Sequence, residues 1–147
     1  MKKKIYLTPE DAEAAFYDAF ERADLTAMMT VWAIDKNTVC IHPQGPRLAG
    51  FEAIRASFSE IFSHGPNLHF DITDLRKHQS QTLAIHCVYE TITHRGAGAA
   101  ADAAPRPLFS TNVYTLTPQG WRILVHHASI SPDGTNTEEQ GTARILH

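Results

Sequence analysis

Cysteine is scarce and long apolar runs are missing in this chain of 147 residues. The two cysteines, Cys40 and Cys87, are too few for a disulfide framework. They are typical of packing residues in a reducing compartment, so we expect a cytoplasmic protein. No apolar run approaches the ~20 residues that a membrane-spanning helix needs. The opening MKKKIYLTPEDAE turns acidic before any apolar stretch, which is not the pattern of a secretory signal.

Excess positive charge is also missing. The chain carries 13 Lys and Arg against 16 Asp and Glu, a formal net charge of −3, so we expect no nucleic-acid or membrane partner. Nine histidines are present, but neither an HxH nor an HExxH motif occurs, and the cysteines form no CxxC. The glycines at 96 and 98 lack the preceding strand of a dinucleotide-binding loop. We therefore expect neither a metal nor a cofactor.

Apolar residues make up 43% of the chain, and three segments space them with the period of an amphipathic helix. The first helix is predicted over 9–22, with Thr8 as its N-cap. A second, shorter helix over 25–33 follows Asp24, another capping residue. The third is predicted over 51–62.

The remaining core-forming segments alternate in polarity or are rich in β-branched residues, which predicts strands. These strands are expected at 38–42, 68–73, 83–90, 109–117 and 121–130. Short turns, such as the one at 117–120, favour antiparallel pairing of the later strands. The segments 96–105 and 131–147 are small or polar and are expected to be poorly ordered.

This order of elements predicts an α+β fold: three helices packed on one face of a strongly curved antiparallel sheet. A curled sheet capped by helices encloses a conical pocket. We expect one domain over residues 1–147, with a core at about 8–130 and a flexible C-terminal tail at about 131–147.

Four short stretches resemble a known superfamily. They are FERADL at 20–25, Trp32-Ala33, Ile41-His42-Pro43 and GPRLAG at 45–50. Together with the order of elements over about 8–130, they resemble the nuclear transport factor 2-like (NTF2-like) superfamily, and within it the SnoaL-like and ketosteroid isomerase-related branch. The resemblance implies a cystatin-like fold, and it is less specific for function because this superfamily hosts several enzymes and also non-catalytic binders.

His42 is the strongest candidate for a catalytic residue. It ends the strand at 38–42, shares the face of Cys40 and precedes Pro43. In ketosteroid isomerases the matching residue is an aspartate that acts as general base. An imidazole with a pKa near its usual ~6.5 is a competent base at neutral pH. Alternatively, His42 only hydrogen-bonds the following loop.

Asn112 lies on the strand at 109–117, on the face that the resemblance points into the pocket. Ketosteroid isomerases carry there a protonated aspartic acid of the oxyanion hole. An amide donates a hydrogen bond without any pKa shift, so Asn112 could keep this role. Tyr114 has the same parity and is a candidate second donor, or else an aromatic residue of the core.

Adjacent residues of a strand point to opposite faces, so only one of His126 and His127 can face the pocket. The apolar residues Trp121, Ile123 and Val125 share the parity of His127. We therefore expect His127 inside, either as a second catalytic acid or as a histidine of the pocket wall.

The candidate substrate-binding residues are Phe16, Tyr17, Trp32, Arg47 and Phe58. Phe16 aligns with the oxyanion-hole tyrosine of ketosteroid isomerases, and Tyr17 is about 100° further round the helix, which favours a rim or interface position. Trp32 and Phe58 either wall an apolar ligand or belong to the core. Arg47 either clamps an anionic group at the pocket mouth or forms a surface ion pair.

These residues predict a protein that binds a small, mostly apolar carbonyl or hydroxyl compound. Cofactor-free proton transfer of the isomerase, dehydratase or cyclase type would use His42 as base, and its pairing with a second histidine is similar to the scytalone dehydratase branch. The alternative is a non-catalytic ligand-binding or dimeric assembly module. A homodimer is expected through residues of outward parity: His86, Val88, His126, Ala128 and Ile130.

Overall fold

The computed structural model describes residues 4–95 and 105–132. The first and third helices match their predicted bounds: α1 is Pro9–Arg22 and α3 is Phe51–Phe62, while α2 is Leu25–Val31. Both predicted caps form, since Thr8 accepts from the Asp11 N–H at 3.0 Å and Asp24 accepts from the Ala27 N–H at 3.0 Å. The segments expected to be poorly ordered lie almost wholly outside the described residues.

Six strands form one open sheet in the order β2-β1-β6-β5-β4-β3. Their bounds are β1 Val39–Ile41, β2 Arg47–Ala49, β3 Leu68–Gln79, β4 Leu83–His94, β5 Arg106–Thr117 and β6 Gly120–Ile130. The expected all-antiparallel pairing is wrong at one place, because β1 runs parallel to β6. The three-residue strand β2 was not predicted, since proline and glycine around it indicate only a turn.

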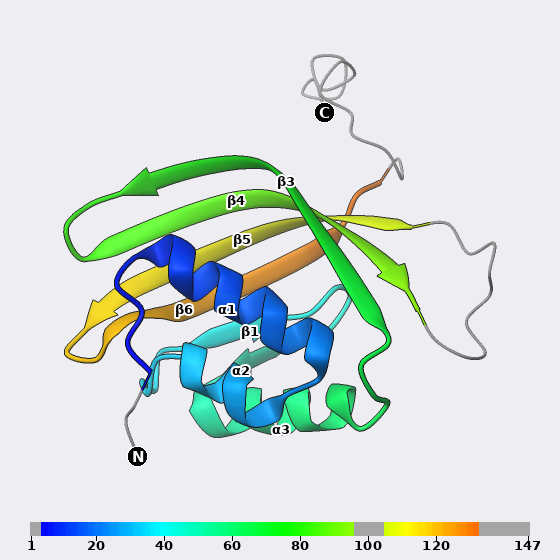
Figure 1. Ribbon diagram of the computed structural model, residues 1–147, viewed down its shortest axis with the longest axis horizontal. Coiled ribbons are helices and arrows are strands. Elements are labelled where there is room, and N and C mark those ends of the chain that lie inside the picture. The colour runs from blue at the N-terminus through cyan, green and yellow to red at the C-terminus, as the bar shows by residue number, and fades with distance from the viewer. Residues whose placement is uncertain (1–3, 96–104, 133–147) are drawn as a thin grey trace.

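The sheet bends around α1, which lies along its concave face, while α2 and α3 lie beneath the edge formed by β1 and β2 (Figure 1). Part of this curvature coincides with two β-bulges. In β3 the register shifts between Thr73 and Arg76, and in β6 Leu124 is an extra residue opposite the Val113-Tyr114 step. The core fills the space between the concave face and the helices.

The bulge at Leu124 has a direct effect on which side chains point inward. Before it, Ile123 is buried; after it, His126 and Ala128 are buried and His127 is exposed. The extra residue reverses the alternation that places Trp121 and Ile123 on the parity of His127. The prediction that His127 faces the interior is therefore wrong, and its neighbour His126 takes that place.

The parity predicted for β4 is also wrong. Ala84, His86, Val88 and Glu90 point inward and are buried. Apolar residues occur at both parities of this strand, so alternation alone does not decide which face is inner. Four of the residues expected on the outer face are buried, namely His86, Val88, His126 and Ala128. Ile130 points to the same inner side as His126 and Ala128.

Candidate functional site

A line of buried polar side chains crosses the inner face of the sheet. Tyr17 comes from α1, Glu90 from β4, Asn112 from β5 and His126 from β6, and their exposed fractions range from 0 to 7%. The strand residues meet because the ladder aligns their inward positions, with Asn112 directly opposite His126. Buried polar groups are costly unless they are hydrogen-bonded to one another.

The hydrogen bonds of this line all point the same way. The Tyr17 hydroxyl donates to the Glu90 carboxylate, and Asn112 Nδ2 donates to the Tyr17 oxygen at 2.9 Å. The amide oxygen of Asn112 is thereby turned to His126, whose Nδ1 lies 2.6 Å away. Because an amide oxygen cannot donate, Nδ1 of His126 carries the proton.

Ser110 forms a second branch beside this line. Its hydroxyl donates to Asn112 Oδ1 at 3.3 Å, and the same oxygen lies 3.3 Å from His126 Nδ1. The Ser110 side chain also lowers the pKa of Glu90. Ser110 therefore interacts with both ends of the line.

Burial dominates the acid–base properties of this line. It raises the pKa of Glu90 to about 7, although the hydrogen bonds from Tyr17 and Ser110 act in the opposite direction. Burial raises the pKa of Tyr17 well above its usual value, and the Glu90 charge adds to this rise. Burial lowers the pKa of His126 to about 3, with further contributions from His42 and His127. His126 is therefore neutral at physiological pH.

His42 follows directly after β1 and lies at the end of the polar line. Its ring centroid is 6.5 Å from that of His126 and 5.2 Å from that of Phe58. Its Nε2 is 3.0 Å from Ser57 Oγ and 3.6 Å from Cys40 Sγ. Burial lowers the pKa of His42, so the half-buried imidazole is neutral at physiological pH.

The aromatic candidates form the apolar part of the interior. Phe16, Trp32 and Phe58 are almost completely buried, and their ring centroids lie 6.3–6.4 Å apart. Phe16 also lies against the His126 ring, at 4.8 Å between centroids. The indole Nε1 of Trp32 is buried and has no hydrogen-bond partner within the part of the chain that the structure describes. Such an unpaired donor is unusual in a core.

Tyr17 does not occupy the rim or interface position that its helical angle favours, because it is only 7% exposed and is hydrogen-bonded to Asn112. The arc of α1 covered by the curved sheet is wide enough to bury both Phe16 and Tyr17. The phenol that contacts Asn112 is thus that of Tyr17. The apolar pattern of α1 does not distinguish Tyr17 from Phe16.

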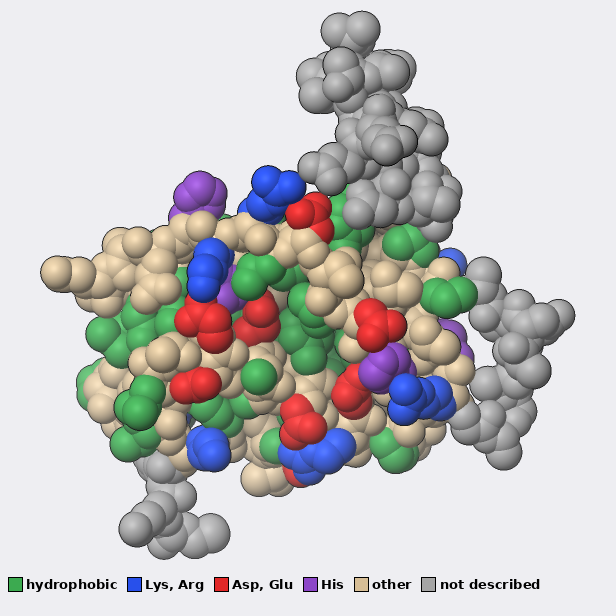
Figure 2. Space-filling view, turned by 45° about the horizontal axis from the view of Figure 1, so that its top comes forward, with side chains coloured by type: hydrophobic (Ala, Val, Ile, Leu, Met, Phe, Trp, Pro, Cys, Tyr) green, Lys and Arg blue, Asp and Glu red, His purple; other side chains and the backbone are tan. Residues whose placement is uncertain are grey.

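Tyr114 belongs to a second buried cluster. Its hydroxyl donates to Glu13 Oε2 at 3.2 Å, and His86 Nδ1 lies 2.8 Å from the same oxygen. His86 Nε2 has no hydrogen-bond partner in the described residues and lies 3.6 Å from Glu10 Oε2, which also pairs with Lys77 at 3.0 Å. Figure 2 shows acidic side chains gathered over the face that carries α1. In the described part of the chain, no hydrogen bond joins Tyr114 to Asn112.

Two predicted site residues lie away from the interior. Arg47 is exposed on β2 and not in a loop, since it pairs with Ile41 of β1. His127 is exposed on the convex face of the sheet, opposite Thr111. The structure therefore brings His42, Asn112, Tyr17 and the aromatic residues together, and leaves Arg47 and His127 outside.

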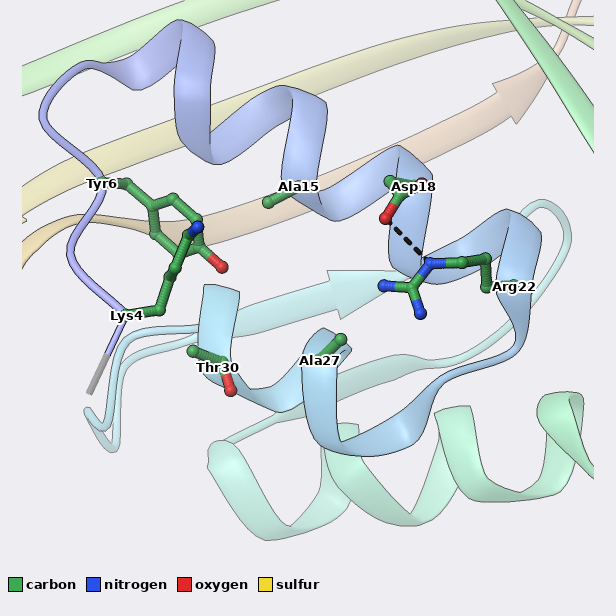
Figure 3. A pocket seen from close by; sticks show the side chains of 7 residues that line it. All are labelled: Lys4, Tyr6, Ala15, Asp18, Arg22, Ala27 and Thr30. Atoms are coloured by element: carbon green, nitrogen blue, oxygen red, sulfur yellow. Dashed lines mark hydrogen bonds and ion pairs between the residues drawn. The ribbon is translucent and has the colours of Figure 1, made fainter. Parts of the chain in front are cut away.

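A separate groove of about 310 Å³ lies between the N-terminal segment, α1 and α2 (Figure 3). Its lining residues are Lys4, Tyr6, Ala15, Asp18, Arg22, Ala27 and Thr30. Within it Arg22 pairs with Asp18 at 2.9 Å. Across residues 4–95 and 105–132, no three His, Cys, Asp or Glu side chains are arranged to hold a metal ion. No helix of that same part of the chain has the length and apolarity to span a membrane.

Known proteins share this architecture. A model of the SnoaL-like domain matches residues 10–133. The chain is 35% identical to a provisionally assigned association domain of calcium/calmodulin-dependent protein kinase type II from Thiobacillus denitrificans, with a TM-score of 0.78 over 87% of this chain and 98% of that one.

A provisionally assigned dehydratase of the NTF2-like family from Streptomyces avermitilis is 27% identical, with a TM-score of 0.72 over 82% of this chain and 92% of that one. A ketosteroid isomerase-like protein from Erwinia carotovora atroseptica shares the fold at 20% identity and a TM-score of 0.64, over 84% and 94% of the two chains. No curated protein matches the chain. The match over residues 10–133 places the chain in the SnoaL-like domain family, on the NTF2-like, cystatin-like fold.

Proposed function

We propose that the chain binds a small, mostly apolar carbonyl or hydroxyl compound beside His42 and catalyses cofactor-free proton transfer on it. The reaction would be of the isomerase, dehydratase or cyclase type. The observation that carries this proposal is the buried line of Glu90, Tyr17, Asn112 and His126, which ends next to His42 among aromatic rings. Such an arrangement is expensive in a core and is typical of acid–base sites.

His42 has the properties of a general base. It is neutral at physiological pH because burial lowers its pKa, and it stays partly accessible at the end of β1. Ser57 Oγ at 3.0 Å restrains the ring. A base needs both a free lone pair and a fixed direction toward the proton that it removes.

His126, and not the predicted His127, would be the second histidine of the site. Its neutral ring lies edge-to-face with that of His42, at 6.5 Å between centroids, so a group bound beside one ring would lie near the other. The unpaired Trp32 N–H is a donor that a carbonyl or hydroxyl oxygen would satisfy. A role for Asn112 as oxyanion donor would use its second amide proton, since the first is bound to Tyr17.

The similarity to a provisionally assigned dehydratase of the same fold supports this class of chemistry. The test is turnover of a panel of small ketones and hydroxy ketones by the wild type, His42→Gln and His127→Gln. His42→Gln should lose at least about 100-fold in kcat/KM. His127→Gln is the matched control, because the same side chain is removed from the convex face.

The pH dependence gives a second readout. Only neutral His42 is a base, so kcat/KM should rise with pH and level off below the ordinary histidine pKa of about 6.5. Equal turnover by wild type and His42→Gln would contradict the proposal. Native mass spectrometry of the purified protein would show whether a small molecule is retained, and its mass would name the compound class.

A second candidate function is a non-catalytic assembly module. The 35% identity to a provisionally assigned association domain supports it. The convex face of the sheet carries half-buried apolar residues, including Ile85, Tyr89, Phe109 and Val113, and could join two copies. We propose a homodimer through this face, in place of the one expected from the opposite parity.

Sedimentation at several concentrations tests the dimer. Val113→Asp, at the centre of the convex face, should shift the protein to monomer, whereas Arg55→Asp on the exposed side of α3 should not. A wild type that is monomeric at every concentration would remove this candidate. The free thiols of Cys40 and Cys87 agree with the cytoplasmic location that we propose.

A further inference from the structure

Which nitrogen of His126 carries the proton decides what this ring can do. With the proton on Nδ1, Nε2 offers a lone pair and can accept a proton or a hydrogen bond. With the proton on Nε2, the same position can only donate. In free histidine both tautomers are accessible, so a protein that uses one of them has to select it through a partner of the other nitrogen.

The partner of Nδ1 is Asn112 Oδ1 at 2.6 Å. An asparagine amide presents either its oxygen or its NH₂ group to a neighbour, so this contact selects a tautomer only if Asn112 is itself held. Tyr17 holds it, because the phenol oxygen accepts from Nδ2 at 2.9 Å. The phenol is free to accept only while its own proton is directed elsewhere.

The Tyr17 hydroxyl directs its proton to Glu90, whose carboxylate accepts the hydrogen bond. We infer that Glu90 is a positioning residue, which acts through Tyr17 and Asn112 to hold His126 as the Nδ1–H tautomer and so leaves its Nε2 lone pair available in the interior. Each step is a hydrogen bond of the structure, and each follows from the donor capacity of the group before it. No hydrogen-bond partner of Nε2 is found within residues 4–95 and 105–132.

Several groups face Glu90 and modulate its charge. On α1 they are Tyr17, which donates to it, and Glu13, whose charge opposes ionisation. Ser110 on β5 lowers the pKa of Glu90, and the Glu90 charge in turn raises the pKa of the Tyr114 phenol and of the Cys40 thiol. Burial keeps Glu90 only partly ionised at neutral pH. The tautomer should therefore be held most strongly at alkaline pH, where the carboxylate is fully charged.

This inference deepens the proposed function and rests on it for its catalytic meaning. In the proposed site, His126 would accept a hydrogen bond from the substrate, and His42 would act as the base. A substrate hydroxyl group fits such an acceptor, whereas a carbonyl oxygen does not. The inference thus places a substrate hydroxyl group at His126. A substrate carbonyl oxygen would instead accept from the Trp32 N–H.

The test is the imidazole ¹⁵N spectrum of labelled protein at pH 8.5, without substrate. The nitrogen chemical shifts separate protonated from unprotonated Nδ1 and Nε2. Wild-type His126 should be Nδ1–H by more than about tenfold, which is the preference that one hydrogen bond in a charged network supports. His127, exposed on the opposite face, is the internal control and should show no such preference.

Three variants locate the cause. Tyr17→Phe removes only the linking hydroxyl, and Glu90→Met removes both acceptor oxygens at similar side-chain length; each should populate the second tautomer of His126. Ser110→Ala cuts the other branch and should leave the tautomer unchanged, because the Asn112 contact is the shorter one. Thermal unfolding of each variant shows which of them are folded at the temperature of measurement.

Wild-type His126 in the Nε2–H form would overturn the inference, without any variant. So would a tautomer that stays more than about tenfold Nδ1–H in both Tyr17→Phe and Glu90→Met. Because the spectrum needs no turnover, a protein with this tautomer and no activity on the panel would refute the proposed function alone. An active protein with the other tautomer would refute the inference alone.

Discussion

Replacing Glu90 by glutamine should change how the stability of the protein depends on pH. Glu90 is 1% exposed, and burial raises its pKa from the ordinary 4.5 to about 7. A carboxyl group whose pKa is higher in the native than in the unfolded state contributes its full stabilisation at pH values below the unfolded-state pKa. That contribution to stability is lost as the pH rises through the native-state pKa. The rise from 4.5 to about 7 corresponds to about 3 kcal/mol in the free energy of unfolding.

His126 contributes in the opposite direction, so the wild-type curve alone is not diagnostic. Burial lowers its pKa from 6.5 to about 3, and its contribution to stability is present above pH 6.5 and is lost as pH falls toward 3. Between pH 4.5 and 6.5 the two effects largely cancel. The difference between wild type and Glu90→Gln removes the histidine contribution and isolates Glu90.

The assay is urea unfolding at pH values from 4 to 8.5, with the free energy of unfolding obtained by linear extrapolation. Relative to Glu90→Gln, the wild type should lose about 3 kcal/mol between the acidic and the alkaline end of this range. Glu60→Gln is the control, since this side chain of α3 remains in water in the folded chain. A wild-type to Glu90→Gln difference that is constant with pH, or that grows in the opposite direction, would refute the reasoning.

Three further outcomes follow from the packing. Phe58→Ala should lower the free energy of unfolding by about 3–5 kcal/mol in urea titrations, because this fully buried ring contacts the other core aromatics; a loss below about 1 kcal/mol would contradict the packing. Gly120→Ala should lower the melting temperature, since its Cβ would lie 2.6 Å from the Tyr6 carbonyl oxygen at a φ of +92°. In the monomeric Val113→Asp variant, a thiol reagent at pH 8 should modify exposed Cys87 in the folded chain and reach Cys40, whose pKa burial raises to about 12, only after unfolding. Two equally fast thiols would contradict this last expectation.

Local sequence patterns predicted the helices well. The first and third helices have the predicted bounds because each combines a regular apolar period with a distinct start. The parallel contact between β1 and β6 could not be predicted in this way, because it joins segments about 85 residues apart and no short turn indicates it. The three-residue strand β2 is likewise held by its partner strand, not by its own sequence.

The candidate site was only partly predictable for a related reason. His42, Asn112 and the aromatic residues were found through the resemblance and through strand position, and they lie in the interior. Glu90 and His126 were missed because their orientation depends on which face of β4 is inner and on a bulge in β6. Alternation along one strand carries neither piece of information. A signal was present for Glu90, namely a single carboxylate within a strand otherwise rich in apolar and β-branched residues.

The extra residue at Leu124 also gives a meaning to the two adjacent histidines. Deleting Leu124 would close the ladder without a bulge, and His126 would keep its place opposite Asn112. Straightening the strand with Leu124 paired to Val113 would instead turn the rest of β6 over and bring His127 to the concave side, opposite Ser110. An imidazole therefore remains on the concave side whether or not this strand bulges.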